Sequence, residues 1–292
     1  MYRIVLIAFL IGAAICLAGS TVQVCSAQDF HVPASATAGE DATISTTGSG
    51  KATFYLLGPG VSRKTDVSLG EEIHLQAQEL RNAGAYLAIV CSSTCRGAGF
   101  YVTAAKPAIL TFLVHPSRVP VAQGDAVSGV ALPFDQFHNL VLTPVTVNFQ
   151  LTAGNAPIFS RQVRTQDGAA WFRTSSGKSA GVVQVLASLD DLSARRAVQQ
   201  VASDPCNLRI KGQRTAVGIL VETEPVHDCA GNVVPDGTIV SFTATGSNSR
   251  STVDAPIKKG VARAQIEGTG EASISVASGV VMGNELRIGA KP

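Results

Sequence analysis

The stretch 135–154 has a near-copy at 228–246, and this repeat constrains the fold of the 292-residue chain more than any other feature. Both copies begin with an acidic residue, continue after three residues with Asn and two apolar residues, and then alternate up to a Phe. The spacing is 93 residues from Asp135 to Asp228 and again from Phe149 to Phe242. It predicts two consecutive small domains that build the same corner.

Residues 238–244 show the alternation clearly. Val240, Phe242 and Ala244 lie on one face of an extended strand, whereas Ser241 and Thr243 lie on the other. A strand with one apolar face belongs in a sandwich of two sheets. Frequent glycines and short polar clusters indicate roughly seven short strands in each small domain. The predicted fold class is therefore all-β, with tandem immunoglobulin-like β-sandwiches.

The chain divides into a leader, 1–27, and three units, which cover 28–105, 106–202 and 203–292. Proline-bearing joints at 104–108 and 202–206 separate the units, because proline interrupts strand pairing and keeps a linker extended. Units two and three match beyond the opening repeat, whereas unit one shares only one late strand with them. The stretch 70–84 fits helix and strand about equally, and we favour a strand followed by a short turn.

The leader is typical of a secretory signal. Arg3 is the only charge before Asp29, an apolar run follows it, and Ala27 is a small residue at a suitable cleavage position. Cleavage after Ser20 is a second option. The alternative is an uncleaved anchor, which would be the only membrane contact of the chain. Either reading predicts an exported protein in the periplasm, at the cell surface or outside the cell.

The motif in unit three resembles the bacterial immunoglobulin-like repeats of the invasin and intimin group. The matching residues there are Asp228, Gly231, Asn232, Val234, Asp236, Gly237, Val240, Phe242, Gly260 and Ala262. Unit two fits less closely, through Asp135, Asn139, Val141, Val147, Phe149, Gly168 and Ala170. Unit one lacks the motif and is assigned to the same fold by its pattern alone. The resemblance implies the fold and a use in adhesins, stalks or other exported proteins.

The repeated motif also has a physical interpretation of its own. Asn and Gly tolerate positive φ, so the Ala-Gly-Asn and Asp-Gly sequences can turn the chain sharply, and the Phe then fills the core. We expect a structural corner in each of the two units. Its residues are Asp135, Asn139 and Phe149 in unit two and Asp228, Asn232 and Phe242 in unit three.

No catalytic, cofactor or metal site is predicted. Residues 177–181 match Gly-x-Ser-x-Gly, but a nucleophile elbow needs a following helix and a strand follows here, so a hairpin turn is expected. Asp190 and Asp191 lack calcium-loop spacing. The net charge of +2 shows no basic stripe, which argues against nucleic acid as a partner. None of the five histidines pairs at metal-ligand spacing: His31, His74, His115, His138 and His227.

Four cysteines follow the leader: Cys91, Cys95, Cys206 and Cys229. An even number in an exported protein indicates disulfides, and three pairings are possible. Pairing within each unit, Cys91 with Cys95 and Cys206 with Cys229, is the simplest because the units fold separately. A redox or metal site is the competing hypothesis, but the first pair lacks Cys-x-x-Cys spacing.

These features favour a non-enzymatic exported protein that acts in adhesion or as a structural stalk. The alternative is an extracytoplasmic binding protein that recognises a carbohydrate, peptide or envelope partner through loops at a sandwich end. The partner in either case is a protein or a surface glycan. Trp171, the single tryptophan, lies on an alternating strand and is expected to pack in a core or at a joint between units.

The leader yields a direct prediction. Mass spectrometry of protein recovered from the envelope or the medium should show an N-terminus between Ser20 and Gln28. An intact N-terminus in a membrane fraction would favour the anchor, and a cytoplasmic pool with free thiols would contradict export.

Overall fold

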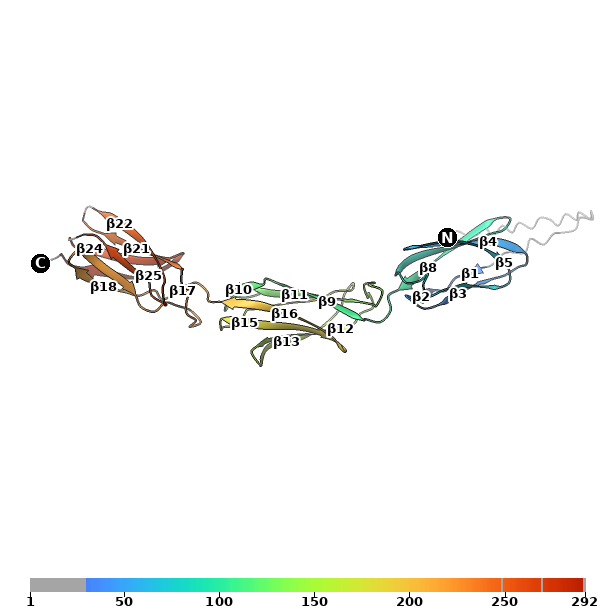
Figure 1. Cartoon of the computed structure of the whole chain (residues 1–292), viewed down its shortest axis with the longest axis horizontal. Coiled ribbons are helices and arrows are strands. Elements are labelled where there is room, and N and C mark those ends of the chain that lie inside the picture. The colour runs from blue at the N-terminus through green and yellow to red at the C-terminus, as the bar shows by residue number, and fades with distance from the viewer. Residues whose placement is uncertain (1–29, 248, 269, 291–292) are drawn as a thin grey trace, which may run out of the picture.

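The computed structural model describes residues 30–247, 249–268 and 270–290, so the predicted leader lies outside the described residues. Three groups of strands follow one another in a row along the chain (Figure 1). The buried apolar side chains form three separate clusters, around Phe54, Phe149 and Phe242. The described residues contain no helix, as the alternating pattern predicts. Each unit therefore has a core of its own.

Unit one is a sandwich of a three-stranded sheet, β1-β3-β6, and a five-stranded sheet, β2-β8-β7-β4-β5. Its strands are β1 (Phe30–His31), β2 (Ser35–Thr37), β3 (Ala42–Thr46), β4 (Lys51–Gly58), β5 (Val61–Ser68), β6 (Glu72–Leu75), β7 (Gly84–Cys91) and β8 (Cys95–Thr103). The stretch 70–84 contains the strand β6 and then a turn, which confirms the preference for strand over helix.

Unit two has the same two layers, a three-stranded sheet β14-β11-β9 and a five-stranded sheet β10-β16-β15-β12-β13. Its strands are β9 (Ile109–His115), β10 (Arg118–Pro120), β11 (Val127–Phe134), β12 (Thr146–Ala153), β13 (Ala156–Arg164), β14 (Ala170–Thr174), β15 (Gly181–Leu189) and β16 (Leu192–Val201). The segment 177–181 connects β14 to β15, which belong to different sheets. The expected hairpin turn is wrong: the chain crosses here from one layer to the other.

Unit three packs a three-stranded sheet, β18-β19-β23, on a four-stranded sheet, β22-β21-β24-β25, and adds the short pair β17-β20. Its strands are β17 (Pro205–Cys206), β18 (Ile210–Thr215), β19 (Gly218–Thr223), β20 (His227–Asp228), β21 (Ile239–Thr245), β22 (Arg250–Pro256), β23 (Arg263–Ile266), β24 (Ala272–Ser278) and β25 (Val281–Ile288).

One central strand is equivalent in all three units: β4, β12 and β21. Each buries a Phe at its middle, Phe54, Phe149 or Phe242, and each Phe is fully inaccessible to solvent. These residues pair with equivalent positions of β7, β15 and β24. Unit one thus shares this strand with the others, a likeness that the sequence analysis missed because the corner motif is absent before it.

Because each unit has a separate core, we expect a core substitution to destabilise only the unit that carries it. Replacing Phe242 with Ala should destabilise unit three by about 3–5 kcal/mol, the usual cost of deleting a buried aromatic ring. Hydrogen exchange read by mass spectrometry should show faster exchange in β21 and β24 and little change in unit one. Phe149→Ala is the matched control and should affect unit two instead. Equal loss of protection in all three units would contradict independent cores.

Candidate functional site

The corner of unit two is organised by the buried carboxylate of Asp135, which is 0% exposed. Its Oδ1 accepts hydrogen bonds from the N–H groups of Phe137 and Asn139, both at 2.9 Å. Its Oδ2 accepts one from Nδ2 of Asn139 at 2.8 Å. A carboxylate that accepts several N–H groups folds the residues after it into a tight turn.

The corner of unit three repeats this arrangement atom for atom around Asp228. Oδ1 accepts the N–H groups of Ala230 at 2.9 Å and Asn232 at 2.8 Å, and Nδ2 of Asn232 lies 3.0 Å from Oδ2. Gly231 has a positive φ of 86°. In unit two His138 occupies the same position with a φ of 66°, a conformation that is unfavourable for a side chain with a Cβ.

Each carboxylate also binds the linker that enters its unit. Ala105 N donates to Oδ2 of Asp135 at 3.0 Å, and Ser203 N donates to Oδ2 of Asp228 at 3.0 Å. Both donors lie two residues before a proline, Pro107 or Pro205. The linker is therefore tied to the corner on one side and restricted by the proline ring on the other.

The asparagine of each corner reaches back to the preceding unit. Nδ2 of Asn139 donates to the carbonyl of Arg81 at 2.7 Å, and its Oδ1 accepts the N–H of Ala83 at 2.8 Å. Asn232 makes the same pair of bonds, to the carbonyl of Lys178 at 2.8 Å and from the N–H of Ala180 at 2.9 Å. An amide side chain here pairs with backbone groups two residues apart, as a neighbouring strand would.

We call the receiving segments 81–84 and 178–181 the sockets. Each ends in a glycine with positive φ, Gly84 at 145° and Gly181 at 141°, directly at the start of β7 or β15. The second socket is formed by the last four residues of the Gly-x-Ser-x-Gly match at 177–181. Its serine, Ser179, uses its carbonyl to accept a hydrogen bond from Gln200 and is followed by a strand, so a nucleophile elbow is not formed.

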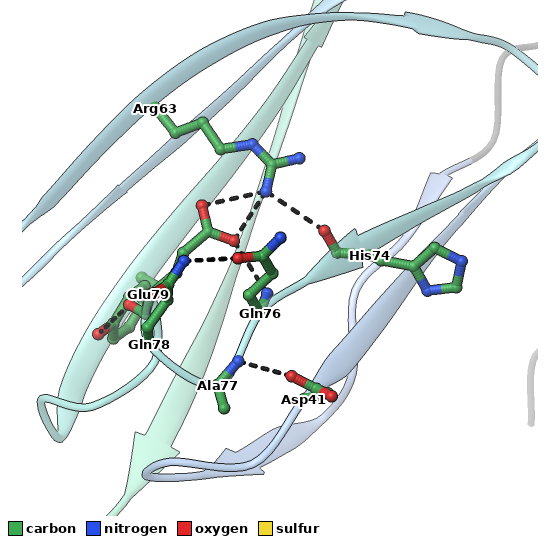
Figure 2. Close-up of polar contacts among 8 residues, drawn as sticks. Asp41, Arg63, His74, Gln76, Ala77, Gln78 and Glu79 are labelled. Atoms are coloured by element: carbon green, nitrogen blue, oxygen red, sulfur yellow. Dashed lines mark hydrogen bonds and ion pairs between the residues drawn. The ribbon is translucent and has the colours of Figure 1, made fainter.

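The turn that precedes the first socket is held by polar contacts within unit one, which Figure 2 shows. Nη1 of Arg63 contacts both carboxylate oxygens of Glu79, at 2.8 and 3.0 Å, and donates to the carbonyl of His74 at 3.2 Å. Asp41 accepts the N–H of Ala77 at 2.6 Å. These bonds fix the turn that precedes Arg81. The socket is thus positioned by the side chains of Arg63 in β5, of Glu79 in the turn after β6 and of Asp41 just before β3.

The two joints differ in what reinforces them. At the first joint the ring of Phe137 packs against the core of unit one, on Gly39, where any Cβ would overlap it. The guanidinium of Arg81 lies 5.1 Å above the same ring. At the second joint the place of Phe137 is taken by an alanine, and a disulfide between Cys206 and Cys229 ties the linker to the corner.

The hydrogen bonds set the charge state of both carboxyls. Burial raises the pKa of Asp135, but the bonds from Asn139 and from the two other N–H groups outweigh burial and bring the pKa below 3.8. Asp228 behaves in the same way, with burial opposed by bonds from Asn232, Ser203 and Ala230. Both corners are therefore held by charged acceptors at neutral pH.

The remaining candidate residues are dispersed. Cys91 and Cys95 are joined across the β7–β8 turn, and Asp190 and Asp191 form the turn between β15 and β16. Within the described ranges, no three His, Cys, Asp or Glu side chains are placed to hold a metal ion. The five histidines lie on separate strands or in the unit-two corner.

The expectation for Trp171 is wrong. Its side chain is 65% exposed, and it lies neither in a core nor at a joint. Its neighbours in β14, Ala170 and Phe172, point inward, so the alternation places Trp171 on the outer face. Across 30–247, 249–268 and 270–290 there is no helix of the length and apolarity that a membrane crossing needs.

The lowered pKa of Asp228 predicts an acid-sensitive joint. Because the folded pKa is depressed, the stabilisation is complete above 3.8 and is lost as the pH falls through the lower folded value. Asp228→Asn should cost unit three about 2 kcal/mol at pH 7, since it replaces an acceptor of several N–H groups. The difference between wild type and variant in chemical denaturation should shrink below pH 3.8, whereas the exposed neighbour Asp204→Asn should be neutral. A difference that does not vary with pH would contradict this.

Sequence comparison finds no matching protein family and no similar curated protein. Similarity appears in three dimensions. The solved chain of FdeC, an Escherichia coli adhesin, matches with a TM-score of 0.64 at 14% identity, over 91% of this chain and 97% of that chain. The solved chain of invasin, a bacterial integrin-binding protein, matches with a TM-score of 0.53 at 13% identity, over 91% of this chain and 60% of that chain. The solved chain of InvD of Yersinia pseudotuberculosis matches with a TM-score of 0.50 at 10% identity, over 89% of this chain and 97% of that chain. The fold that these solved chains share with this protein is that of tandem immunoglobulin-like β-sandwiches.

Proposed function

We propose that the chain is an exported, non-enzymatic surface or envelope protein whose tandem sandwiches form a stiff stalk in adhesion. The observation that supports this most is the repeated joint. At both joints one asparagine bonds the preceding unit and one carboxylate bonds the linker. A linker without such bonds would leave neighbouring domains free to move relative to one another.

Export is supported by the leader and by the disulfides. Cys91–Cys95 and Cys206–Cys229 are formed, and structural disulfides persist in oxidising compartments rather than in the cytosol. The compartment that we propose is the periplasm, the cell surface or the medium. The names of FdeC and invasin describe an adhesin and an integrin-binding protein, and we extend from them only the proposal that a protein or surface glycan is the partner.

A groove at the end of unit three supports the alternative, a binding protein that acts through sandwich-end loops. The groove has a volume of about 560 Å³ and lies between the loops after β21 and β23. Its lining combines small polar residues with Glu267, Glu271 and Arg287, which suits a polar ligand such as a peptide or carbohydrate. Binding there would be compatible with a stalk, because the joints lie elsewhere.

The stalk proposal is tested by loosening the joints. Asn139→Ala and Asn232→Ala each remove two hydrogen bonds between units, worth about 0.5–1.5 kcal/mol apiece. Small-angle X-ray scattering of the double variant should show a wider distribution of interdomain distances than the wild type, with each unit still folded. Asn155→Ala, at the exposed β12–β13 turn, is the matched control. A wild type as flexible as the double variant would overturn the stalk.

A further inference from the structure

An exposed apolar row crosses the three-stranded sheet of unit two. Val130 of β11 pairs with Trp171 of β14 on one side and with Leu113 of β9 on the other. Trp171 is 65% exposed and Leu113 is 55% exposed. We call these three residues the tryptophan face. The chain has only one tryptophan, and its side chain faces solvent on the edge strand β14 rather than lying in a core.

The equivalent row in unit three shows what the fold itself requires at these positions. Glu222 of β19 pairs there with Arg263 of β23 and with Lys211 of β18. The carboxylate of Glu222 lies 2.7 Å from Arg263 and 2.9 Å from Lys211. A row of opposite charges suits a solvated sheet face. The apolar row of unit two is therefore not needed for folding and indicates a contact surface.

A second apolar face lies on β4 and β7, two strands of the five-stranded sheet of unit one. Leu57 of β4 pairs with Leu87 of β7, and both are 40% exposed. Tyr55 and Ile89 form the next row on the same face and are half-buried. We call these four residues the leucine face. On the neighbouring strand β8 these two rows continue with Gly97 and Gly99, so β8 adds no side chain to the leucine face.

The leucine face is also peculiar to its unit. The pair that corresponds to Leu57 and Leu87 is Thr152 and Gln184 in unit two, and Thr245 and Ser273 in unit three. Both of those pairs are polar. At this pair of positions the same fold therefore carries polar side chains in two units and leucines in the third, which again points to a contact.

The borders of the two faces have opposite charge. Arg173 and His115 are exposed in the row next to the tryptophan face, where Ser128 pairs with both. Beside the leucine face a groove is lined by the acidic residues Asp66, Glu71 and Glu72 together with Lys51, and Lys64 lies over Tyr55. The whole units agree with the borders: unit one has seven acidic and five basic side chains, and unit two has five acidic and eight basic ones.

We propose that the tryptophan face of one copy binds the leucine face of a second copy of this chain. Apolar rows would meet in the centre, and the Arg173 border would meet the acidic groove. Contact between two tryptophan faces is disfavoured, because it would bring two Arg173 borders together without a counter-charge. Each copy would bind one neighbour through its tryptophan face and another through its leucine face. The contact is therefore heterologous, and a chain of copies has an unoccupied face at each end.

The contact is expected to be weak for a single pair. The tryptophan face is one row on three strands and the leucine face is two rows on two strands. With strands about 4.8 Å apart, the area that they can bury is below that of stable complexes. Copies held side by side on one surface would reinforce each other, because tethering raises their effective concentration. Self-association would then link neighbouring stalks laterally, with unit two of one copy beside unit one of the next.

Sedimentation velocity of the disulfide-bonded exported chain tests this over a concentration series. One variant copies the charged row of unit three into unit two and carries Leu113→Lys, Val130→Glu and Trp171→Arg. The other, Leu57→Thr with Leu87→Ser, copies the polar pair of unit three into unit one. The wild type should grow in mass without a plateau, and each variant alone should remain a monomer. Val280→Ser, which alters a 92% exposed residue elsewhere, should behave as the wild type does.

The decisive sample is an equimolar mixture of the two variants, because each retains one intact face. We expect this mixture to form a one-to-one dimer and nothing larger. A monomeric wild type at several hundred micromolar, association that survives either variant, or a mixture that stays monomeric would each overturn the proposal. If a multiple variant is unfolded by circular dichroism, the single changes Trp171→Arg and Leu87→Ser replace it with the same expected outcomes.

Discussion

The arrangement of the units depends on one buried carboxylate in each corner. This carboxylate accepts hydrogen bonds from its own turn, from the incoming linker and from a neighbouring asparagine. Without the side-chain carboxylate of Asp135 or Asp228, several N–H groups would lose their acceptor in a place that water does not reach. The same carboxylate orients Nδ2 and Oδ1 of the asparagine toward the preceding unit. Local folding of a corner and the attachment of one domain to another are therefore the same event.

The two joints reach this result with different reinforcement. The first adds an aromatic ring, Phe137, that enters the core of its predecessor, and the second adds the Cys206–Cys229 disulfide. Unit one has no counterpart of the corner asparagine, since the position 14 residues before Phe54 is Glu40 and Ile44 follows it four residues later. Among the three described units, the motif is thus found in the two that follow another described sandwich.

Sequence alone predicted much of the fold. Alternation identified the strands because a sandwich exposes one face of each sheet, and the corner was recognised because Asp, Asn and Gly are the residues that build sharp turns. The sockets could not be predicted, because Asn139 and Asn232 bind backbone groups, and backbone groups leave no signature in a sequence. The exposure of Trp171 could be predicted, because Ala170 and Phe172 alternate with it and face the core. The interior was expected instead because large aromatic side chains are usually well buried.

Residual dipolar couplings of the isotopically labelled exported chain test the central claim most directly, since they report the orientation of each sandwich in one alignment frame. If the corner carboxylates and asparagines fix every unit to its predecessor, the three units should share one alignment tensor at neutral pH. Three tensors of different magnitude, each well fitted by its own unit, would show that the joints move freely and would contradict the account.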